Sequence, residues 1–218
     1  MIDDDSPPVV TEIAGTIAIV RLNRPAQRNP LSLAILQELK RTTSALFTRN
    51  DIQTVIFTGA ADVFASGANI NELAQLDSAT APEFSKFGQD LFQTIADARQ
   101  VTIAAINGYC MGGALDLALA CDIRVASQSA IFSHPGAKLG IITGWGGTQR
   151  LPRIIGRTRA LEFFATARRY TSLEALELGL VSFVGDPVIV HARKLAMERK
   201  KVAENPPPSV RGNSSLNN

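Results

Sequence analysis

The stretch that decides the fold reads Ala104-Ala105-Ile106-Asn107-Gly108-Tyr109-Cys110-Met111-Gly112-Gly113-Ala114-Leu115-Asp116. An apolar strand is expected to end at Ile106, a glycine-rich turn follows, and a helix begins near Gly112. The first N–H groups of a helix have no partner inside the helix, and the helix dipole adds roughly half a positive charge at that end. Because glycine also lets a ligand approach the backbone closely, such a turn can hold an anion or a developing oxyanion.

A carboxylate lies close to this turn. Asp116 follows Gly113 after about one helical turn, so the two residues share one face of the expected helix. This spacing brings an acid and a backbone donor into one site. The alternative is that the glycines only permit tight packing and that Asp116 is a solvated helix residue. Spacing alone leaves both interpretations open.

The rest of the chain alternates between strand and helix patterns. Apolar, β-branched runs bounded by turn residues predict strands at residues 16–22, 52–58, 101–106, 121–126 and 181–184. Helical spacing of apolar residues predicts helices at 32–48, 81–98, 112–120, 148–155, 158–167, 172–178 and 187–204, the first capped by Ser32. We therefore expect one α/β domain over residues 1–204. Residues 205–218, rich in Pro, Ser, Gly and Asn, are predicted to be a disordered tail.

Composition narrows the class of protein. The chain has 218 residues, 45% of them apolar and 19% charged, which suits a globular domain. Its formal net charge is +2 with both signs interspersed, so no nucleic-acid partner is predicted. Cys110 and Cys121 are the only cysteines and form no metal-ligand pattern. They suit a reducing compartment.

Targeting and membrane signals are weak in this sequence. The N-terminus, Met1-Ile2-Asp3-Asp4-Asp5, is acidic where an export signal would be basic. The most apolar segment, residues 101–123, contains Asp116 and Asp122, and two charges inside one membrane span are costly. We therefore expect a cytoplasmic protein with no membrane partner.

Four segments together carry a family resemblance. They are Asn23-Arg24-Pro25 and residues 64–70, 104–123 and 144–152, and their order and spacing resemble the crotonase (enoyl-CoA hydratase/isomerase) superfamily from about residue 9 to residue 204. The resemblance implies a spiral of β-β-α units with a helical C-terminal region, here expected to be shortened. It also implies an acyl-CoA thioester substrate, no separate cofactor, no metal, and assembly into trimers or dimers of trimers.

The resemblance also implies the site residues. The thioester carbonyl would be held by the backbone N–H groups of Ser66 and Gly113, with Asp116 as the acid/base. Positions that would bind CoA or substrate are Arg28, near the phosphates, and Ala65, Ala68, Ile70, Gly112, His134 and Trp145. Two of these have an alternative. Trp145 either lines the acyl pocket or packs in the core. His134 either replaces a family acid that this chain lacks at Gly136 or has a structural role.

One departure from the family pattern bears on the activity. Hydratases of the family use two glutamates; the first aligns with Asp116 and the second with Gly136, so the second acid is missing. Because water addition asks for two positioned proton-transfer groups, we expect hydration to be very slow. Double-bond isomerisation needs only one base. The alternatives are an acyl-CoA decarboxylase acting on a malonyl-type substrate, because the run Leu139-Gly140-Ile141-Ile142 resembles some decarboxylase-type members, and a non-catalytic acyl-CoA-binding or assembly protein.

Overall fold

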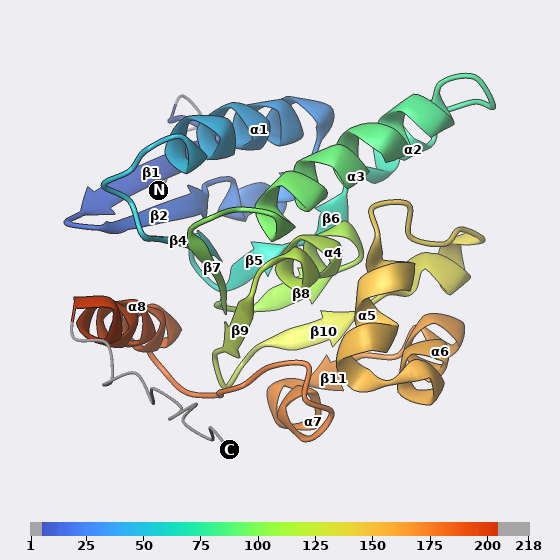
Figure 1. The fold of residues 1–218 in the computed structure, drawn as a ribbon. Coiled ribbons are helices and arrows are strands. Elements are labelled where there is room, and N and C mark those ends of the chain that lie inside the picture. The colour runs from blue at the N-terminus through green and yellow to red at the C-terminus, as the bar shows by residue number, and fades with distance from the viewer. Residues whose placement is uncertain (1–5, 205–218) are drawn as a thin grey trace, which may run out of the picture.

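The computed structural model describes residues 6–204, and the predicted tail at 205–218 lies outside the described residues. Its main sheet has five strands in the order β1-β2-β4-β7-β9. These are β1 (Val9–Ala14), β2 (Ile17–Leu22), β4 (Thr54–Gly59), β7 (Val101–Ile106) and β9 (Ile123–Ala126). β1 and β2 form an antiparallel hairpin and the other pairs are parallel (Figure 1). The apolar, β-branched runs predicted as strands supply the central members of this sheet.

A second sheet of four short strands, ordered β11-β10-β8-β5, follows the first. It contains β5 (Val63–Ala65), β8 (Tyr109–Met111), β10 (Ile131–Ser133) and β11 (Tyr170–Thr171). The chain repeatedly passes from a strand of the first sheet to a strand of the second and then on to helices. β4 leads to β5 and, after β6, to α2 and α3, and β7 leads to β8 and α4. This is the predicted α/β arrangement of successive β-β-α units. A small parallel pair, β3 (Pro30–Leu31) with β6 (Gly67–Ala68), completes the strands described.

Seven of the helices described follow the predicted ranges closely, whereas α2 was not predicted. The helices are α1 (Leu33–Phe47), α2 (Ile70–Leu73), α3 (Ala81–Ala96), α4 (Gly113–Ala120), α5 (Gly147–Ile155), α6 (Arg157–Thr166), α7 (Ser172–Glu177) and α8 (Val188–Glu204), with 3-10 turns η1 (Pro25–Gln27) and η2 (Pro135–Leu139). Ser32 caps α1 as expected, its hydroxyl accepting from Ile35 N–H. The strand predicted at 181–184 is reduced to a single bridge between Val184 and Ala126.

Two hydrophobic clusters hold the elements together. The larger encloses α4, in which every residue from Ala114 to Ala120 is buried. A helix that is buried all round cannot show an amphipathic stripe, so its position in the centre of the domain is a tertiary effect. The smaller cluster joins the other face of the main sheet to α8 through Val188, Ala192 and Ala196 (Figure 1).

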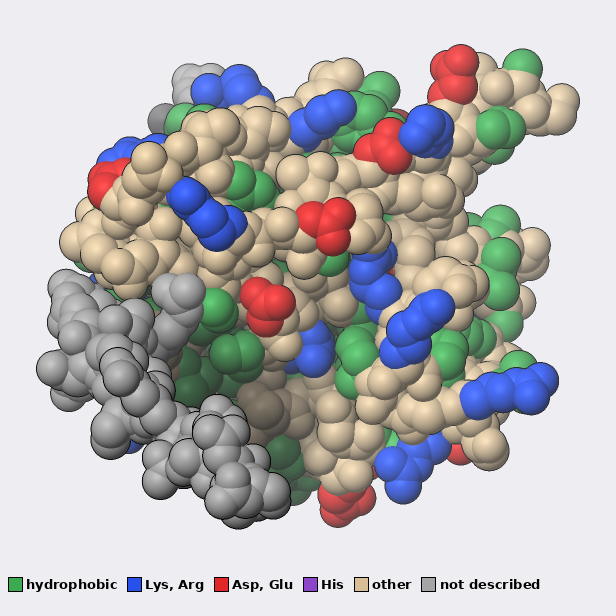
Figure 2. Space-filling model, viewed as in Figure 1, with side chains coloured by type: hydrophobic (Ala, Val, Ile, Leu, Met, Phe, Trp, Pro, Cys, Tyr) green, Lys and Arg blue, Asp and Glu red, His purple; other side chains and the backbone are tan. Residues whose placement is uncertain are grey.

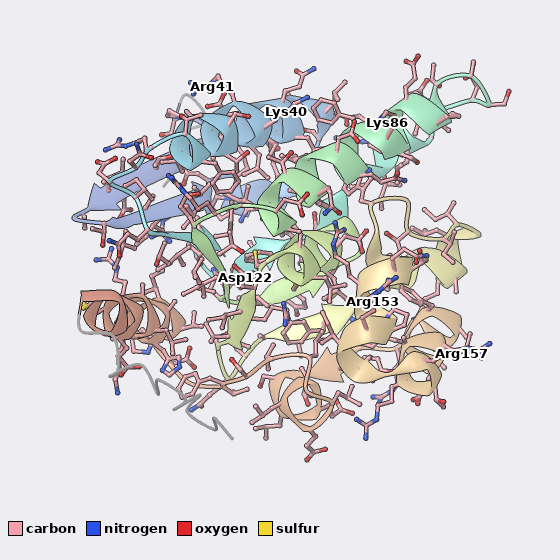
Figure 3. The ribbon with its side chains drawn as sticks, in the orientation of Figure 1. Lys40, Arg41, Lys86, Asp122, Arg153 and Arg157 are labelled. Atoms are coloured by element: carbon pink, nitrogen blue, oxygen red, sulfur yellow. The ribbon has the colours of Figure 1, made fainter. Side chains whose placement is uncertain are left out.

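Surface charges are mixed in sign, as predicted. Figure 2 shows acidic and basic side chains interspersed on one face, and Lys40, Lys86 and Arg157 point away from the ribbon in Figure 3. Asp122 is exposed as well, and its carboxylate accepts hydrogen bonds from the N–H and hydroxyl of Thr102 at 2.8 and 2.9 Å. In the described part of the chain no helix is both long and apolar enough to span a bilayer.

Candidate active site

The glycine turn leads from β8 into α4 as the sequence predicts. Gly112 has φ of 54°, in the left-handed region that favours glycine, and its N–H donates to the carbonyl of Ser133 at 2.9 Å. This conformation reverses the chain so that Gly113 is the first residue of α4. The N–H of Gly113 therefore lies at the positive end of the helix dipole, without an acceptor inside the helix.

A second backbone segment lies against this helix start. A Cβ placed on Gly67 would be 3.1 Å from the nitrogen of Gly113 and 2.5 Å from the carbonyl oxygen of Met111, so only glycine permits this approach. The backbone nitrogen of Ala68 is 3.5 Å from the position that a Cβ of Gly113 would take. The nitrogens of Ala68 and Gly113 are thus neighbours on two different segments.

The predicted donor Ser66 is engaged elsewhere. Its N–H donates to the carbonyl oxygen of Arg28 at 2.9 Å, a bond that fixes the strand after β5 to the turn after η1. An N–H that already has this partner is not free to bind a thioester oxygen. The structure therefore does not bring Ser66 N–H together with Gly113 N–H as a pair of open donors.

Asp116 is wholly buried, which rules out the solvated-helix interpretation. The hydroxyl of Thr143 donates a hydrogen bond to one carboxylate oxygen, Oδ2. The other oxygen, Oδ1, lies 3.4 Å from Nε2 of His134. A Cβ on Gly147 would come within 3.1 Å of the carboxylate carbon, so the wall on that side is closed as well.

The negative charge of Asp116 also acts on Arg150. Burial lowers the pKa of Arg150, and the nearby negative charge of Asp116 opposes this shift. Arg150 also donates to the carbonyl oxygen of Trp145 at 3.2 Å. The cation is thereby tied to the loop that carries Thr143 and approaches the carboxylate.

His134 and Gly136 lie at a small apolar pocket between η2 and α6. Its volume is about 250 Å³, and its lining residues are His134, Gly136, Ala137, Ile141, Ile142, Leu161, Phe164 and Ala165. Gly136 is buried, and a Cβ there would be 2.5 Å from the carbonyl oxygen of Ile141. No acidic side chain is among the residues that line this pocket.

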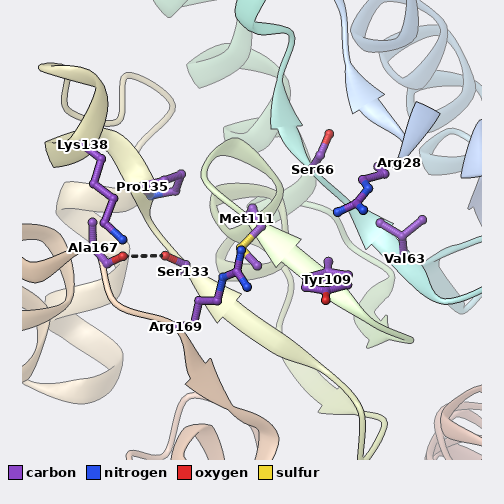
Figure 4. Close-up of a pocket in the computed structure, with 10 residues that line it drawn as sticks. All are labelled: Arg28, Val63, Ser66, Tyr109, Met111, Ser133, Pro135, Lys138, Ala167 and Arg169. Carbon is purple, nitrogen blue, oxygen red and sulfur yellow. Dashed lines mark hydrogen bonds between the residues drawn. The ribbon is translucent and has the colours of Figure 1, made fainter. Parts of the chain in front are cut away.

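A basic pocket of about 280 Å³ is also lined in part by residues of η2 (Figure 4). Its lining includes Ser66 and Met111 at the turn, together with three cations, Arg28, Lys138 and Arg169. The guanidinium of Arg28 lies 5.6 Å from the centre of the Tyr109 ring, so its stem is directed along the pocket wall. Such a cluster suits an anionic ligand such as a phosphate.

The remaining predicted contacts divide between surface and core. Ile70 is 62% exposed, beside the partly buried Ala68, whereas Ala65 is fully buried in β5. Trp145 is only 4% exposed, with its ring centre 5.3 Å from that of Phe84 and 5.7 Å from that of Phe92. Core packing is therefore the interpretation of Trp145 that the structure favours.

Two sequence features prove to be structural. Cys110 is buried, and burial raises the pKa of its thiol well above the ordinary value, which suits a small packing residue rather than a nucleophile. The side chain of Asn107 accepts from Gly59 N–H at 3.0 Å and donates to the carbonyl of Ala61 at 2.7 Å. No group of three or more potential metal ligands occurs between residues 6 and 204.

This combination of spiral fold, glycine turn and buried carboxylate agrees with the sequence comparison. The sequence model of the enoyl-CoA hydratase/isomerase family matches residues 12–213. The chain belongs to this family. The predicted membership of the crotonase superfamily is thereby confirmed, and an acyl-CoA enzyme is the general class of activity.

Named relatives of this enoyl-CoA hydratase/isomerase family member include hydratases. The short-chain-enoyl-CoA hydratase of Clostridium acetobutylicum is 34% identical over 93% of this chain and 78% of that protein. The crotonyl-CoA hydratase of Syntrophomonas wolfei is 36% identical over 89% of this chain and 74% of the relative. Among solved structures, the enoyl-CoA hydratase of Bacillus anthracis aligns with a TM-score of 0.83 and 37% identity, covering 91% of this chain and 78% of that one. The high TM-score confirms the predicted fold class.

Three site residues of this family member were missed by the sequence analysis. Lys138 and Arg169 join Arg28 at the basic pocket, and Thr143 binds Asp116. Lys138 follows directly after the Pro135-Gly136-Ala137 turn, so its place beside the site had a local signal. Thr143 and Arg169 had none, because their partners lie on other elements.

Proposed function

We propose that this chain binds an acyl-CoA thioester and stabilises its enolate while a proton moves between two carbons, which is the isomerase activity of its family. The observation that carries the proposal is the pairing of an open helix start at Gly113 with the buried carboxylate of Asp116 one turn later. Negative charge that develops on the thioester oxygen would meet backbone N–H dipoles, and the acid/base group would stand beside the adjacent carbon.

The two donors in this proposal are the N–H groups of Gly113 and Ala68. Ala68 replaces Ser66 in this role, because the N–H of Ser66 already donates to Arg28 while the nitrogen of Ala68 lies next to Gly113. Both donors belong to backbone held by packed glycines, so little reorganisation is needed when charge develops. Loss of one such donor typically lowers a rate by about 10²–10³.

The CoA phosphates are proposed to bind at the basic pocket. Arg28, Lys138 and Arg169 come from three separate segments, and all three are exposed. Charged hydrogen bonds from guanidinium and ammonium groups to phosphate are among the strongest available to a protein surface. Because Ser66 and Met111 line the same pocket, the thioester end of a ligand bound there could reach the glycine turn. The proposal needs no further cofactor, and we propose a trimeric assembly on the pattern of the family.

Isomerisation is preferred to hydration for a specific reason. No acidic side chain lines either the basic pocket or the apolar one, so Asp116 stands without a second carboxylate there. Decarboxylation is the second candidate, favoured because both oxygens of Asp116 already have partners. A decarboxylase would need the oxyanion donors but no free base, since the substrate's own carboxylate leaves.

The donor assignment is tested by Ala68→Pro, which removes one N–H, with Ala68→Ser as the matched control that keeps it. The assay follows 3-butenoyl-CoA isomerisation, crotonyl-CoA hydration and malonyl-CoA decarboxylation, together with CoA affinity and a thermal melt. We expect isomerisation to fall about 10²–10³-fold in Ala68→Pro alone. A folded Ala68→Pro protein with full activity would contradict the assignment, and rapid crotonyl-CoA hydration by the native protein would contradict the choice of isomerase.

A further inference from the structure

We infer that His134, held by Asp116, is the residue that carries the proton to and from the acyl group. This inference rests on the proposed function and changes the part that Asp116 plays in it. Asp116 becomes the positioning residue, and the imidazole becomes the catalytic acid/base.

The first step of the argument is the enclosure of Asp116. Its carboxylate has no exposed surface, Thr143 donates to Oδ2, and His134 lies against Oδ1. Gly147 closes a further side, where even a Cβ would come within 3.1 Å of the carboxylate carbon. A carboxylate with both oxygens engaged and no free surface is placed to orient a neighbour rather than to meet a substrate.

The second step is the direction in which His134 opens. His134 lines the apolar pocket, and its Nε2 faces Asp116. Its other ring nitrogen, Nδ1, makes no hydrogen bond with any described residue. Nor is Nδ1 among the fully enclosed side-chain atoms of the described chain that lack a hydrogen-bond partner. The imidazole therefore joins the buried carboxylate on one side to the pocket on the other.

Asp116 is the charged group in contact with His134, and the residues that line the apolar pocket around the ring carry no charge. From α6 the ring meets Phe164, with 5.2 Å between ring centres, and the other pocket residues of α6 are Leu161 and Ala165. From η2 and the loop after it the pocket residues are Gly136, Ala137, Ile141 and Ile142. All of these are uncharged. A buried carboxylate bonded to one imidazole nitrogen fixes the ring and stabilises the imidazolium that forms at the other, the same division of labour as in a Ser-His-Asp triad.

The proton transfers balance without a co-reactant. Neutral His134 takes a proton from the carbon next to the thioester carbonyl, and the C–H electron pair forms the enolate, whose oxygen is held by the backbone donors. The imidazolium and the Asp116 carboxylate are then a neutralised pair. Return of the proton to the γ-carbon completes isomerisation of a 3-enoyl thioester, and return of a solvent deuteron to the α-carbon gives exchange.

The test uses the full-length protein with His134→Ala and His134→Gln. Isomerisation of 3-butenoyl-CoA and α-proton exchange of butanoyl-CoA in deuterated water are measured with and without added imidazole. Both variants should lose about 10²–10⁴ in rate while keeping CoA affinity. Imidazole should restore part of the activity of His134→Ala, because the vacated space adjoins a pocket. His191→Ala is the matched control, since this second histidine lies on α8, where it stacks on Phe183. Its removal should leave both rates unchanged, with or without imidazole.

Three outcomes separate the hypotheses. Loss of activity in both variants with imidazole rescue of His134→Ala supports the inference. Full activity in a folded His134→Gln protein, or a loss in His134→Ala that imidazole never relieves, overturns it and returns the proton transfer to Asp116. A native protein that binds CoA but catalyses neither reaction overturns the proposed function itself.

Discussion

Restoring a glutamate at position 136 looks like the direct route to hydratase activity, and the structure predicts that it fails. A Cβ on Gly136 would be 2.5 Å from the carbonyl oxygen of Ile141, 3.4 Å from its carbonyl carbon and 3.6 Å from Cα of Ile142. All three are backbone atoms, which cannot rotate away as a side chain can. The N–H of Ile141 also donates to the carbonyl of Gly136 at 3.0 Å, so a hydrogen bond holds the two ends of this turn together.

The expected cost follows from that contact. Overpacking a fixed site typically costs about 1–3 kcal/mol. For a chain of this length, each kcal/mol shifts the melting temperature by about 2–4 °C. Gly136→Ala should therefore lower Tm by about 2–12 °C, and Gly136→Glu by at least as much, with no gain of crotonyl-CoA hydration. Ala137→Glu, at the exposed next residue, is the control and should leave Tm nearly unchanged.

A thermal melt and a hydration assay decide the matter together. If Gly136→Glu has the melting temperature of the parent protein and hydrates crotonyl-CoA, the turn adjusts to the added side chain at little cost. Position 136 can then hold a working second acid. If it melts with the parent and shows no hydration, the clash argument is wrong but position 136 does not face the substrate. Only a destabilised, hydration-free variant agrees with the reasoning.

Two further predictions concern stability. Trp145→Ala should lower the free energy of unfolding by about 3–5 kcal/mol, because the indole fills the space between α3 and α4; Trp145→Phe should cost less, and urea titration measures both. The Arg168 guanidinium and the hydrogen bonds from Thr171 lower the pKa of Glu174 to about 2. A depressed pKa stabilises the fold above the ordinary value of 4.5, and the effect is lost as the pH falls toward 2. Glu174→Gln should therefore make the melting temperature depend less on pH in that window. The loss of unfolding free energy should be less than about 1 kcal/mol, since the side chain is 37% exposed.

The elements were predictable because their signals are local. β7 (Val101–Ile106) matches its predicted range, since a run of β-branched and small apolar residues ends at a glycine turn. α1 was located by Ser32, whose hydroxyl accepts from Ile35 N–H within a single turn of chain. Where a signal needed a distant partner it was weaker: β9 begins at Ile123 rather than residue 121, because Asp122 bonds to Thr102 on the neighbouring strand.

The site was predictable in position and not in detail. Gly113 and Asp116 follow from spacing, but the partner that occupies Ser66 N–H is Arg28 on another segment, and no local pattern reveals it. Thr143 and His134 reach Asp116 across 27 and 18 residues of chain. Whether a carboxylate is free or enclosed depends on such long-range contacts, so the sequence could name the acid without showing that both its oxygens are taken.

The glycine turn also joins two interpretations that the sequence kept apart. Tight packing and ligand binding were alternatives, yet the structure makes one the cause of the other. The Gly113 Cα faces Trp145, whose Cε3 would be 2.5 Å from a Cβ there, and Gly67 lets its own strand close on Gly113 nitrogen. Had either position carried a side chain, the segment holding Ala68 and the start of α4 would be forced apart. The close packing is therefore what would bring two backbone donors within reach of a single oxygen.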